Sequence, residues 1–198
     1  MSGSRDLVGM IAALALAATL AAPALAAGPV IGTLGVGGTG CPAGTASASL
    51  TGGGRVLSLK FSSYRASAGG ARSFDRKACG VSIPLTVPAG KSVAIVGVSY
   101  AGRSSLPSGA SARLSAEIFF AGGKGPVATK TISGPSSGQF SFSTASVGTV
   151  WSACGASLNL RVNSSLLVKT SGGKTASTSI RSQDIGAALI YQLKYKSC

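Results

Sequence analysis

The sequence predicts an all-β domain, a two-sheet antiparallel sandwich or jelly roll of about ten strands that is stabilised by disulfides. Three observations support this fold class. Apolar and polar residues alternate over most of the chain, as in strands with one buried and one solvated face. Turns rich in glycine and proline separate these stretches, and no stretch combines helical spacing with helix caps. The part of the chain that contains these alternating stretches also contains four cysteines, an even number that suits disulfide pairing.

The first 27 residues are predicted to be a cleavable secretory signal peptide. A short polar start precedes the apolar run Leu7 to Ala22, and the small residues Ala24 and Ala26 suit a signal peptidase. The run is shorter than the roughly 20 residues that cross a bilayer, and no later segment is apolar enough to do so. We therefore expect a secreted protein, extracellular or at the cell surface, in an oxidising compartment and without an integral membrane segment after cleavage.

The 171 residues that remain after cleavage are about the length of one domain. Residues 28–40 are rich in glycine and are expected to form a flexible leader, which leaves 41–198 as a single β-sandwich domain. Within the leader, residues 35–40 fit a dinucleotide-binding pattern. That reading fails because no strand comes before the pattern and Cys41-Pro42 stands where a helix should begin.

Alternation is clearest in six stretches, each with an apolar and a polar face. The predicted strands are 57–62, 81–87, 113–120, 140–142, 158–162 and 189–196. Turn signals lie at 52–54, 88–90, 106–109, 122–126, 134–138 and 171–174. Pro84 lies inside one of these strands, which indicates an edge position or a bulge.

The mature chain keeps four cysteines, Cys41, Cys79, Cys154 and Cys198. We expect two disulfides and no zinc site, because the chain has neither paired Cys-x-x-Cys spacing nor histidine. If Leu50 and Val56 flank a hairpin turn, Cys41 and Cys79 lie at the same end of a sheet. This favours Cys41–Cys79 and Cys154–Cys198. Three up-and-down strands after Cys154 would instead place its partner at the far end, so the sequence leaves the pairing open.

Six short motifs place the cysteines and other residues in a fixed order. They are Gly40-Cys41-Pro42, Arg76-Lys77-Ala78-Cys79, Tyr100-Ala101-Gly102, the stretch 134–140, Trp151-Ser152-Ala153-Cys154-Gly155 and Tyr195-Lys196-Ser197-Cys198. The ordered set, over residues 40–198, resembles the secreted domain-of-unknown-function family 4360. The resemblance implies a small exported β-rich domain, found in bacteria and fungi, with no established activity and no catalytic residues to carry over.

The composition excludes several enzyme classes. The chain has no histidine, and the only acidic residues after the signal are Asp75, Glu117 and Asp184. A Ser-His-Asp triad, a Cys-His pair and a histidine-ligated metal site are therefore excluded. A glycosidase would need two of these three acids about 5–10 Å apart. We expect a protein that is not an enzyme and that uses neither a metal nor a cofactor.

Positive charge is the main functional signal. The mature chain keeps the formal charge of +14, because the signal carries one basic and one acidic residue. Arg65, Arg72, Arg76 and Lys77 fall in one predicted Gly/Ser-rich loop, 64–79. This loop is a candidate anion-binding site, since guanidinium groups bind phosphate or carboxylate. In the alternative reading, dispersed charge only keeps the protein soluble, and the spread of the other basic residues favours it.

Three aromatic residues are candidates for ligand contact: Tyr64, Tyr100 and Trp151. Tyr64 begins the basic loop. Tyr100 and Trp151 would form either core packing, which is the commoner role, or a platform for a sugar ring. Asn163-Ser164-Ser165 is an N-glycosylation sequon on the predicted outward face, and it matters only in a eukaryotic source.

Three functions are compatible with these features. The first is an exported, non-enzymatic binding protein at or near the cell envelope, with an anionic cell-surface polymer or a membrane surface as its partner. Nucleic acid is not expected. The second is a secreted effector or toxin-like protein whose charge helps it reach anionic membranes. The third is a structural surface-coat component that assembles through exposed strand edges. The sequence does not determine the oligomeric state.

Overall fold

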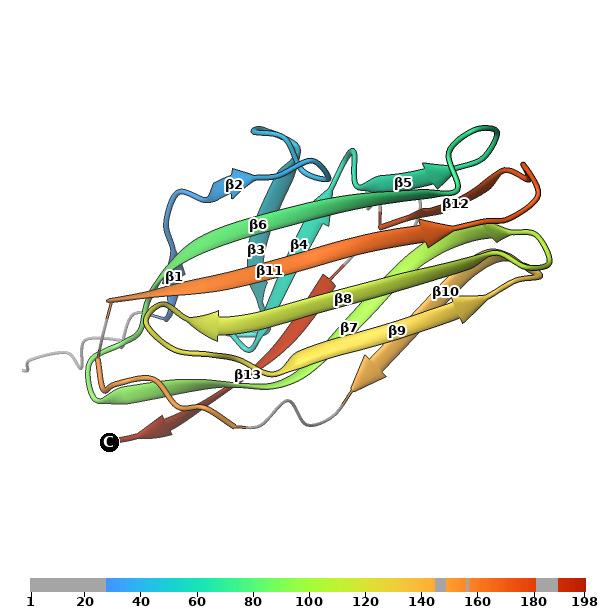
Figure 1. Ribbon diagram of the computed structural model, residues 1–198. Coiled ribbons are helices and arrows are strands. Elements are labelled where there is room, and N and C mark those ends of the chain that lie inside the picture. The colour runs from blue at the N-terminus through green and yellow to red at the C-terminus, as the bar shows by residue number, and fades with distance from the viewer. Residues whose placement is uncertain (1–27, 145–148, 156, 181–188) are drawn as a thin grey trace, which may run out of the picture.

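In the computed structural model, two antiparallel sheets face each other (Figure 1). The structure describes residues 28–144, 149–155, 157–180 and 189–198, so the predicted signal peptide lies outside the described residues. Over these ranges all regular elements are strands, and no helix there is long and apolar enough to cross a membrane. The prediction of a disulfide-stabilised, all-β sandwich is confirmed.

The first sheet, sheet A, is built around two long strands. Its members are β1 (Val30–Ile31), β2 (Gly35–Gly37), β6 (Phe74–Thr86), β8 (Ser111–Phe120), β9 (Val127–Ser133) and β11 (Ser157–Lys169). β6 and β11 pair along their whole lengths, and β8 and then β9 extend the sheet from β11. β1 and β2 pair one after the other with β6 and share one position at the opposite edge.

The second sheet, sheet B, is organised by β7. Its members are β3 (Ala46–Thr51), β4 (Val56–Phe61), β5 (Arg65–Ala68), β7 (Lys91–Leu106), β10 (Ser136–Thr144), β12 (Ala176–Ser179) and β13 (Leu189–Ser197). β10 pairs with one side of β7, whereas β13 and β12 pair with successive parts of its other side. β4 and β5 continue the sheet from β13 and β12 respectively, and β3 forms a hairpin with β4.

Three pairs of strands are therefore collinear: β1 with β2, β4 with β5, and β13 with β12. The thirteen strands of the described residues occupy ten positions, five in each sheet, which agrees with the predicted number. The inward residues of the alternating strands form one apolar core between the sheets, including Leu59, Ile83, Leu160 and Leu189, which are all fully buried. Burial of this apolar surface is the main stabilising contribution.

β7 is the longest strand, yet the alternation did not predict it. Ser92 to Ile95 are all buried, so this part of the strand has no wet face. The segment 149–155 pairs with the edge of this part of β7: Trp151 bridges Ala94, and Ser152 exchanges hydrogen bonds of 2.9 and 3.0 Å with the backbone of Val93. A strand that is buried on both faces loses the alternating pattern.

Residues 28–40 differ from the expected flexible leader, because β1 and β2 pair with β6. The Gly40 N–H donates to the Ala78 carbonyl at 2.8 Å, and the Ala78 N–H donates to Thr39 Oγ1 at 3.0 Å. Gly40 is buried, and a Cβ there would overlap the ring of Tyr64. At this position glycine permits close packing and is not a sign of flexibility.

The first disulfide links the two sheets, and the second links two segments that are both hydrogen-bonded to β7 of sheet B or to the residue before it. Cys41, just before β3, is bonded to Cys79 within β6, and Cys154, before β11, is bonded to Cys198 after β13. The favoured pairing is therefore confirmed. The alternative assumed three up-and-down strands after Cys154, which would place its partner at the far end of the sheet. It is wrong because β12 and β13 run in the same direction along β7 and together cross the sheet only once.

Replacing Cys41 and Cys79 together by alanine is expected to destabilise the fold more than the same double change at Cys154 and Cys198. The bonded cysteines are separated by 38 and 44 residues, so each loss removes a similar loop-closure contribution, about 4 kcal/mol. Only Cys41 and Cys79 are buried, so only their replacement also leaves a cavity. Urea unfolding followed by circular dichroism measures the difference, and equal losses would contradict it.

Candidate functional site

The four basic residues predicted to share one loop do not converge. Arg65 begins β5 and is exposed on the outer face of sheet B, and Arg72 lies in the turn that leads to β6. Arg76 and Lys77 belong to β6, and Arg76 is exposed on the outer face of sheet A. The Gly/Ser-rich stretch forms a connection between the two sheets, so a clamp made by these four side chains is not formed.

Lys77 contributes to this connection. Its Nζ atom lies 3.7 Å from Asp75 Oδ1, and Asp75 Oδ2 accepts a hydrogen bond of 2.9 Å from the Ser67 N–H of β5. Asp75 thus ties β6 of sheet A to β5 of sheet B. The ion pair is partly solvated and adds little stability by itself, but it neutralises one of the four predicted anion-binding charges.

Arginine and serine side chains instead gather on the outer face of sheet B, where β5, β12, β7 and β10 lie side by side. Two neighbouring rows of paired residues run across these strands. The first row consists of Arg65, Ser179, Arg103 and Gln139, and the second of Ser67, Ser177, Ser105 and Ser137. We call these eight residues the arginine–serine face. Neighbouring strands are about 4.8 Å apart, so the Cα atoms of Arg65 and Arg103 are separated by roughly 10 Å.

A shallow depression lies between the two arginines. Its free volume is about 350 Å³, and it is lined by Arg65, Arg103, Ser104, Ser105, Ser137, Gly138, Ser177 and Ser179. No acidic residue is among them, and neither arginine forms an ion pair within the part of the chain that the structure describes. Among the described residues, the depression therefore combines two arginines that have no ion-pair partner with several hydroxyl groups, a composition that suits anions.

Small residues position this face. Gly102 precedes Arg103, and a Cβ at Gly102 would overlap the Ser179 carbonyl and approach the Phe140 ring to 2.5 Å. Glycine thus allows β12 and β10 to pack closely on both sides of β7. Thr178 then donates a hydrogen bond of 3.2 Å from Oγ1 to the Arg103 carbonyl, which fixes β12 against the strand that carries the arginine.

The face continues toward Arg72. A second open depression, of about 680 Å³, is lined by Ser67, Ala68, Gly69, Ala71, Arg72 and Thr175, and it shares Ser67 with the arginine–serine face. Two of the predicted residues, Arg65 and Arg72, therefore lie along one surface. Sequence reasoning missed Arg103, which it counted among the dispersed charges. The available signal was Arg103 and Ser105, two residues apart and therefore on the same outer face of an unrecognised strand.

Tyr64 and Tyr100 are core residues, which corrects their assignment as contact candidates. Tyr64 is fully buried, and its hydroxyl lies 3.1 Å from Ser164 Oγ, which donates in turn to the Cys79 carbonyl at 3.3 Å. Burial raises the pKa of Tyr64 to about 12, although the Ser164 hydrogen bond and the Arg76 charge oppose this. Tyr100 stacks on Phe142 with ring centroids 5.5 Å apart, and burial raises its pKa well above the ordinary value.

Trp151 is half-buried at the other end of β7. The Lys196 ammonium lies 4.5 Å from the centroid of the Trp151 ring, so a cation already occupies one face of the indole. Ala94, which Trp151 bridges, is nine residues from Arg103, or roughly 30 Å along the strand. Trp151 is therefore not part of the arginine–serine face.

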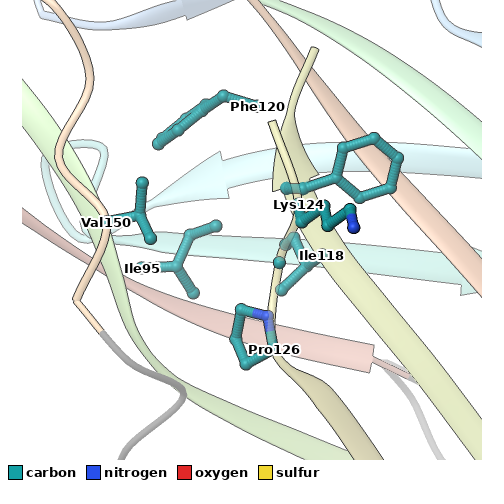
Figure 2. Close-up of a pocket in the computed structure, with 8 residues that line it drawn as sticks. Ile95, Ile118, Phe120, Lys124, Pro126 and Val150 are labelled. Carbon is teal, nitrogen blue, oxygen red and sulfur yellow. The ribbon is translucent and has the colours of Figure 1, made fainter. Parts of the chain in front are cut away.

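An apolar pocket near this end of β7 is too small for a ligand. It lies between the sheets and is lined by Ile95 of β7, by Ile118 and Phe120 of β8, and by Pro126 and Val150 (Figure 2). Its free volume is about 20 Å³, enough for a single water molecule. It is a gap in the packing.

The acidic residues do not form a facing pair where they are described. Asp75 points toward sheet B, whereas Glu117 lies on the outer face of sheet A, and Asp184 is outside the described residues. Asn163 of the sequon is exposed on the same outer face as Glu117, which it opposes across β11 and β8.

Comparison with known families gives a direct match. The model of the family described as "Domain of unknown function (DUF4360)" matches residues 27–198. The chain belongs to this family. An "Uncharacterized secreted protein" of Arthroderma benhamiae is 30% identical over 168 residues, which cover 82% of this chain and 69% of the relative. The family resemblance and the secreted location predicted from the sequence are thereby confirmed.

Similar solved structures are distant. The carbohydrate-binding module TmCBM61, solved in complex with β-1,4-galactotriose, aligns with a TM-score of 0.29 and 10% identity over 83% of this chain and 88% of that chain. Infectious bursal disease virus, Gx strain, aligns with a TM-score of 0.23 and 14% identity over 94% of this chain and 42% of that chain. TM-scores this low support no conclusion about the function of this chain.

Changing Tyr64 to phenylalanine is expected to lower the free energy of unfolding by about 1 kcal/mol, because it removes a buried hydrogen bond. Tyr191 is the matched control. Its hydroxyl is buried and has no hydrogen-bond partner among the described residues, so Tyr191→Phe should be neutral or stabilising. Urea unfolding of both variants tests this, and a larger loss in Tyr191→Phe would contradict it.

Stability is expected to fall as pH rises from about 10 to about 12. Tyrosine in the unfolded chain ionises near pH 10, whereas folded Tyr64 keeps its proton to about pH 12. In this interval the unfolded state binds fewer protons, so the contribution that is fully present below pH 10 is lost. Urea midpoints across the interval measure the slope. Tyr64→Phe should show a shallower slope, and an unchanged slope would show that Tyr64 is not the cause.

Proposed function

We propose that this protein is an exported, non-enzymatic binding protein that holds an anionic polymer at or near the cell envelope through the arginine–serine face. The placement of Arg65 and Arg103 carries the proposal: they lie in one row over a depression lined by serines and free of acidic side chains. Each guanidinium can bind phosphate or carboxylate through two parallel N–H···O bonds, and the serine hydroxyls supply further donors.

The shape of the surface favours a polymer over a single small anion. The depression is shallow and continues past Ser67 to Arg72, so successive charged groups of one chain can be bound at once. The net charge of +14 raises the local concentration of polyanions around the protein and speeds their association. The secreted location brings it into contact with wall polyanions, acidic polysaccharides and anionic lipid headgroups.

A second candidate function, a structural coat, is favoured by the edge of sheet B. β10 has nine residues without a charge, and no strand in the described ranges pairs with its outer edge. An uncharged edge strand is a template for pairing with another copy. Light scattering at increasing concentration tests this candidate, since a protein that stays monomeric at all concentrations would rule it out.

The double variant Arg65→Gln, Arg103→Gln is expected to bind anionic polymers at least tenfold more weakly, because each lost charge-assisted hydrogen bond contributes about 1.5–3 kcal/mol. Arg113→Gln, Arg161→Gln is the matched control, with the same charge change at exposed positions on the outer face of sheet A.

Co-sedimentation with isolated cell envelopes, long-chain polyphosphate and polygalacturonate, at about 0.1 M and about 0.5 M salt, measures binding by all three proteins. Equal weakening in both double variants would show that diffuse charge alone is responsible, and it would overturn the assignment of the arginine–serine face.

A further inference from the structure

The outer face of sheet A carries a groove with a different chemistry. Five residues lie opposite one another across its strands: Gly37 of β2, Gly80 of β6, Asn163 of β11, Glu117 of β8 and Val127 of β9. Ala78, Ser165 and Ser115 form the adjacent row, and Arg76 closes one side. We call this the sheet A groove. Its free volume is about 380 Å³, within the range of small-molecule sites.

Two of the three glycines that line the groove, Gly37 and Gly80, are not required by the fold, whereas Gly38 has a positive φ. A Cβ at Gly37 would have no atom within 4 Å, and a Cβ at Gly80 would meet only the Gly37 carbonyl at 3.6 Å and Asn163 Oδ1 at 3.7 Å. Neither residue has a positive φ. Glycine inside a strand lowers stability, and it commonly marks a place where a ligand approaches the backbone. Here the missing side chains keep the floor of the groove open.

The polar groups around this floor are mixed in charge. Arg76 contributes a cation and Glu117 an anion, so the groove has no net charge, in contrast to the arginine–serine face. Glu117 Oε1 accepts a hydrogen bond of 3.3 Å from the Gly125 N–H, which holds the carboxylate in place. The Asn163 amide and the serine hydroxyls both donate and accept hydrogen bonds.

We infer that the sheet A groove binds a neutral polyhydroxylated chain, namely a segment of an uncharged polysaccharide. Each sugar hydroxyl both donates and accepts a hydrogen bond, so it matches a site with a carboxylate, an amide, a guanidinium and hydroxyls side by side. An anionic ligand would be repelled by Glu117, and a cationic ligand by Arg76. This site is separate from the proposed anion site, because the two lie on the outer faces of different sheets.

The test uses the mature, oxidised protein produced in a bacterium, where the Asn163 sequon is not modified. Tetrasaccharides of β-1,4-linked glucose, N-acetylglucosamine and galactose are added to about 10 mM, enough to populate a millimolar site. Backbone amide shifts are followed by NMR. We expect at least one sugar to shift the amides of Gly37, Gly80 and Asn163. No shift with any of the three sugars, or shifts confined to sheet B, would overturn the inference.

Variants locate the site. Gly80→Val should fill the groove and weaken sugar binding at least tenfold, whereas Gly97→Val, a similarly unstrained glycine in sheet B, should leave it unchanged. Asn163→Ala removes the amide and Glu117→Gln removes the negative charge, both without adding bulk, and each should weaken binding several-fold. Binding that persists in Gly80→Val and in both polar variants would overturn the inference.

The two proposed sites can fail independently. Gly80→Val should keep its binding to polyphosphate, and Arg65→Gln, Arg103→Gln should keep its binding to the neutral sugar. Loss of both activities in either variant would indicate a single shared site and would contradict the separation of the two faces.

Discussion

The contact between the two sheets is the constraint on which the rest of the structure depends, and its centre lies at Cys79. The disulfide joins this residue of β6 to Cys41, where the chain passes into β3. The hydrogen bond between the Tyr64 and Ser164 hydroxyls crosses between the same two sheets, and Ser164 donates in turn to the Cys79 carbonyl within sheet A. These polar and covalent links lie within an otherwise apolar core, whose burial provides most of the stabilisation. With the inner faces fixed in this way, the outer faces are free to differ.

The outer faces do differ, although both are built from small residues. Serines on the outer sides of β5, β7, β10 and β12, namely Ser67, Ser105, Ser137 and Ser177, keep the sheet B surface low beside the exposed Arg65 and Arg103. On sheet A the same effect comes from Gly37 and Gly80. The 29 glycines and the many serines of this chain are therefore not a sign of weak structure. They shape two broad shallow surfaces on a rigid framework.

The sequence was sufficient for the fold class and for the strands with one dry face, such as β6 and β11, because alternation is a local property. The cysteine pairing could be decided only from the structure, in which β12 and β13 lie end to end along β7 and cross sheet B once. The candidate site could not be predicted, because Arg65, Arg103 and Ser179 come from three distant strands and meet only through pairing with β7. The predicted basic loop was misjudged for a related reason. The short strand Arg65-Ala66-Ser67-Ala68 does alternate, but its buried residues are alanines. A stretch of small residues without a large apolar side chain looks like a loop in the sequence.

The order of the two disulfides along the chain affects how the protein matures during export. The bonds enclose separate stretches, Cys41 to Cys79 and Cys154 to Cys198, and neither loop contains a cysteine of the other. An oxidase on the far side of the membrane can therefore close the first bond while the later strands are still being translocated. The second bond must wait for β13, which completes the middle of sheet B. Maturation would then proceed in two oxidation steps, and the first would tie β6 to the chain that enters β3 before the arginine–serine face is assembled.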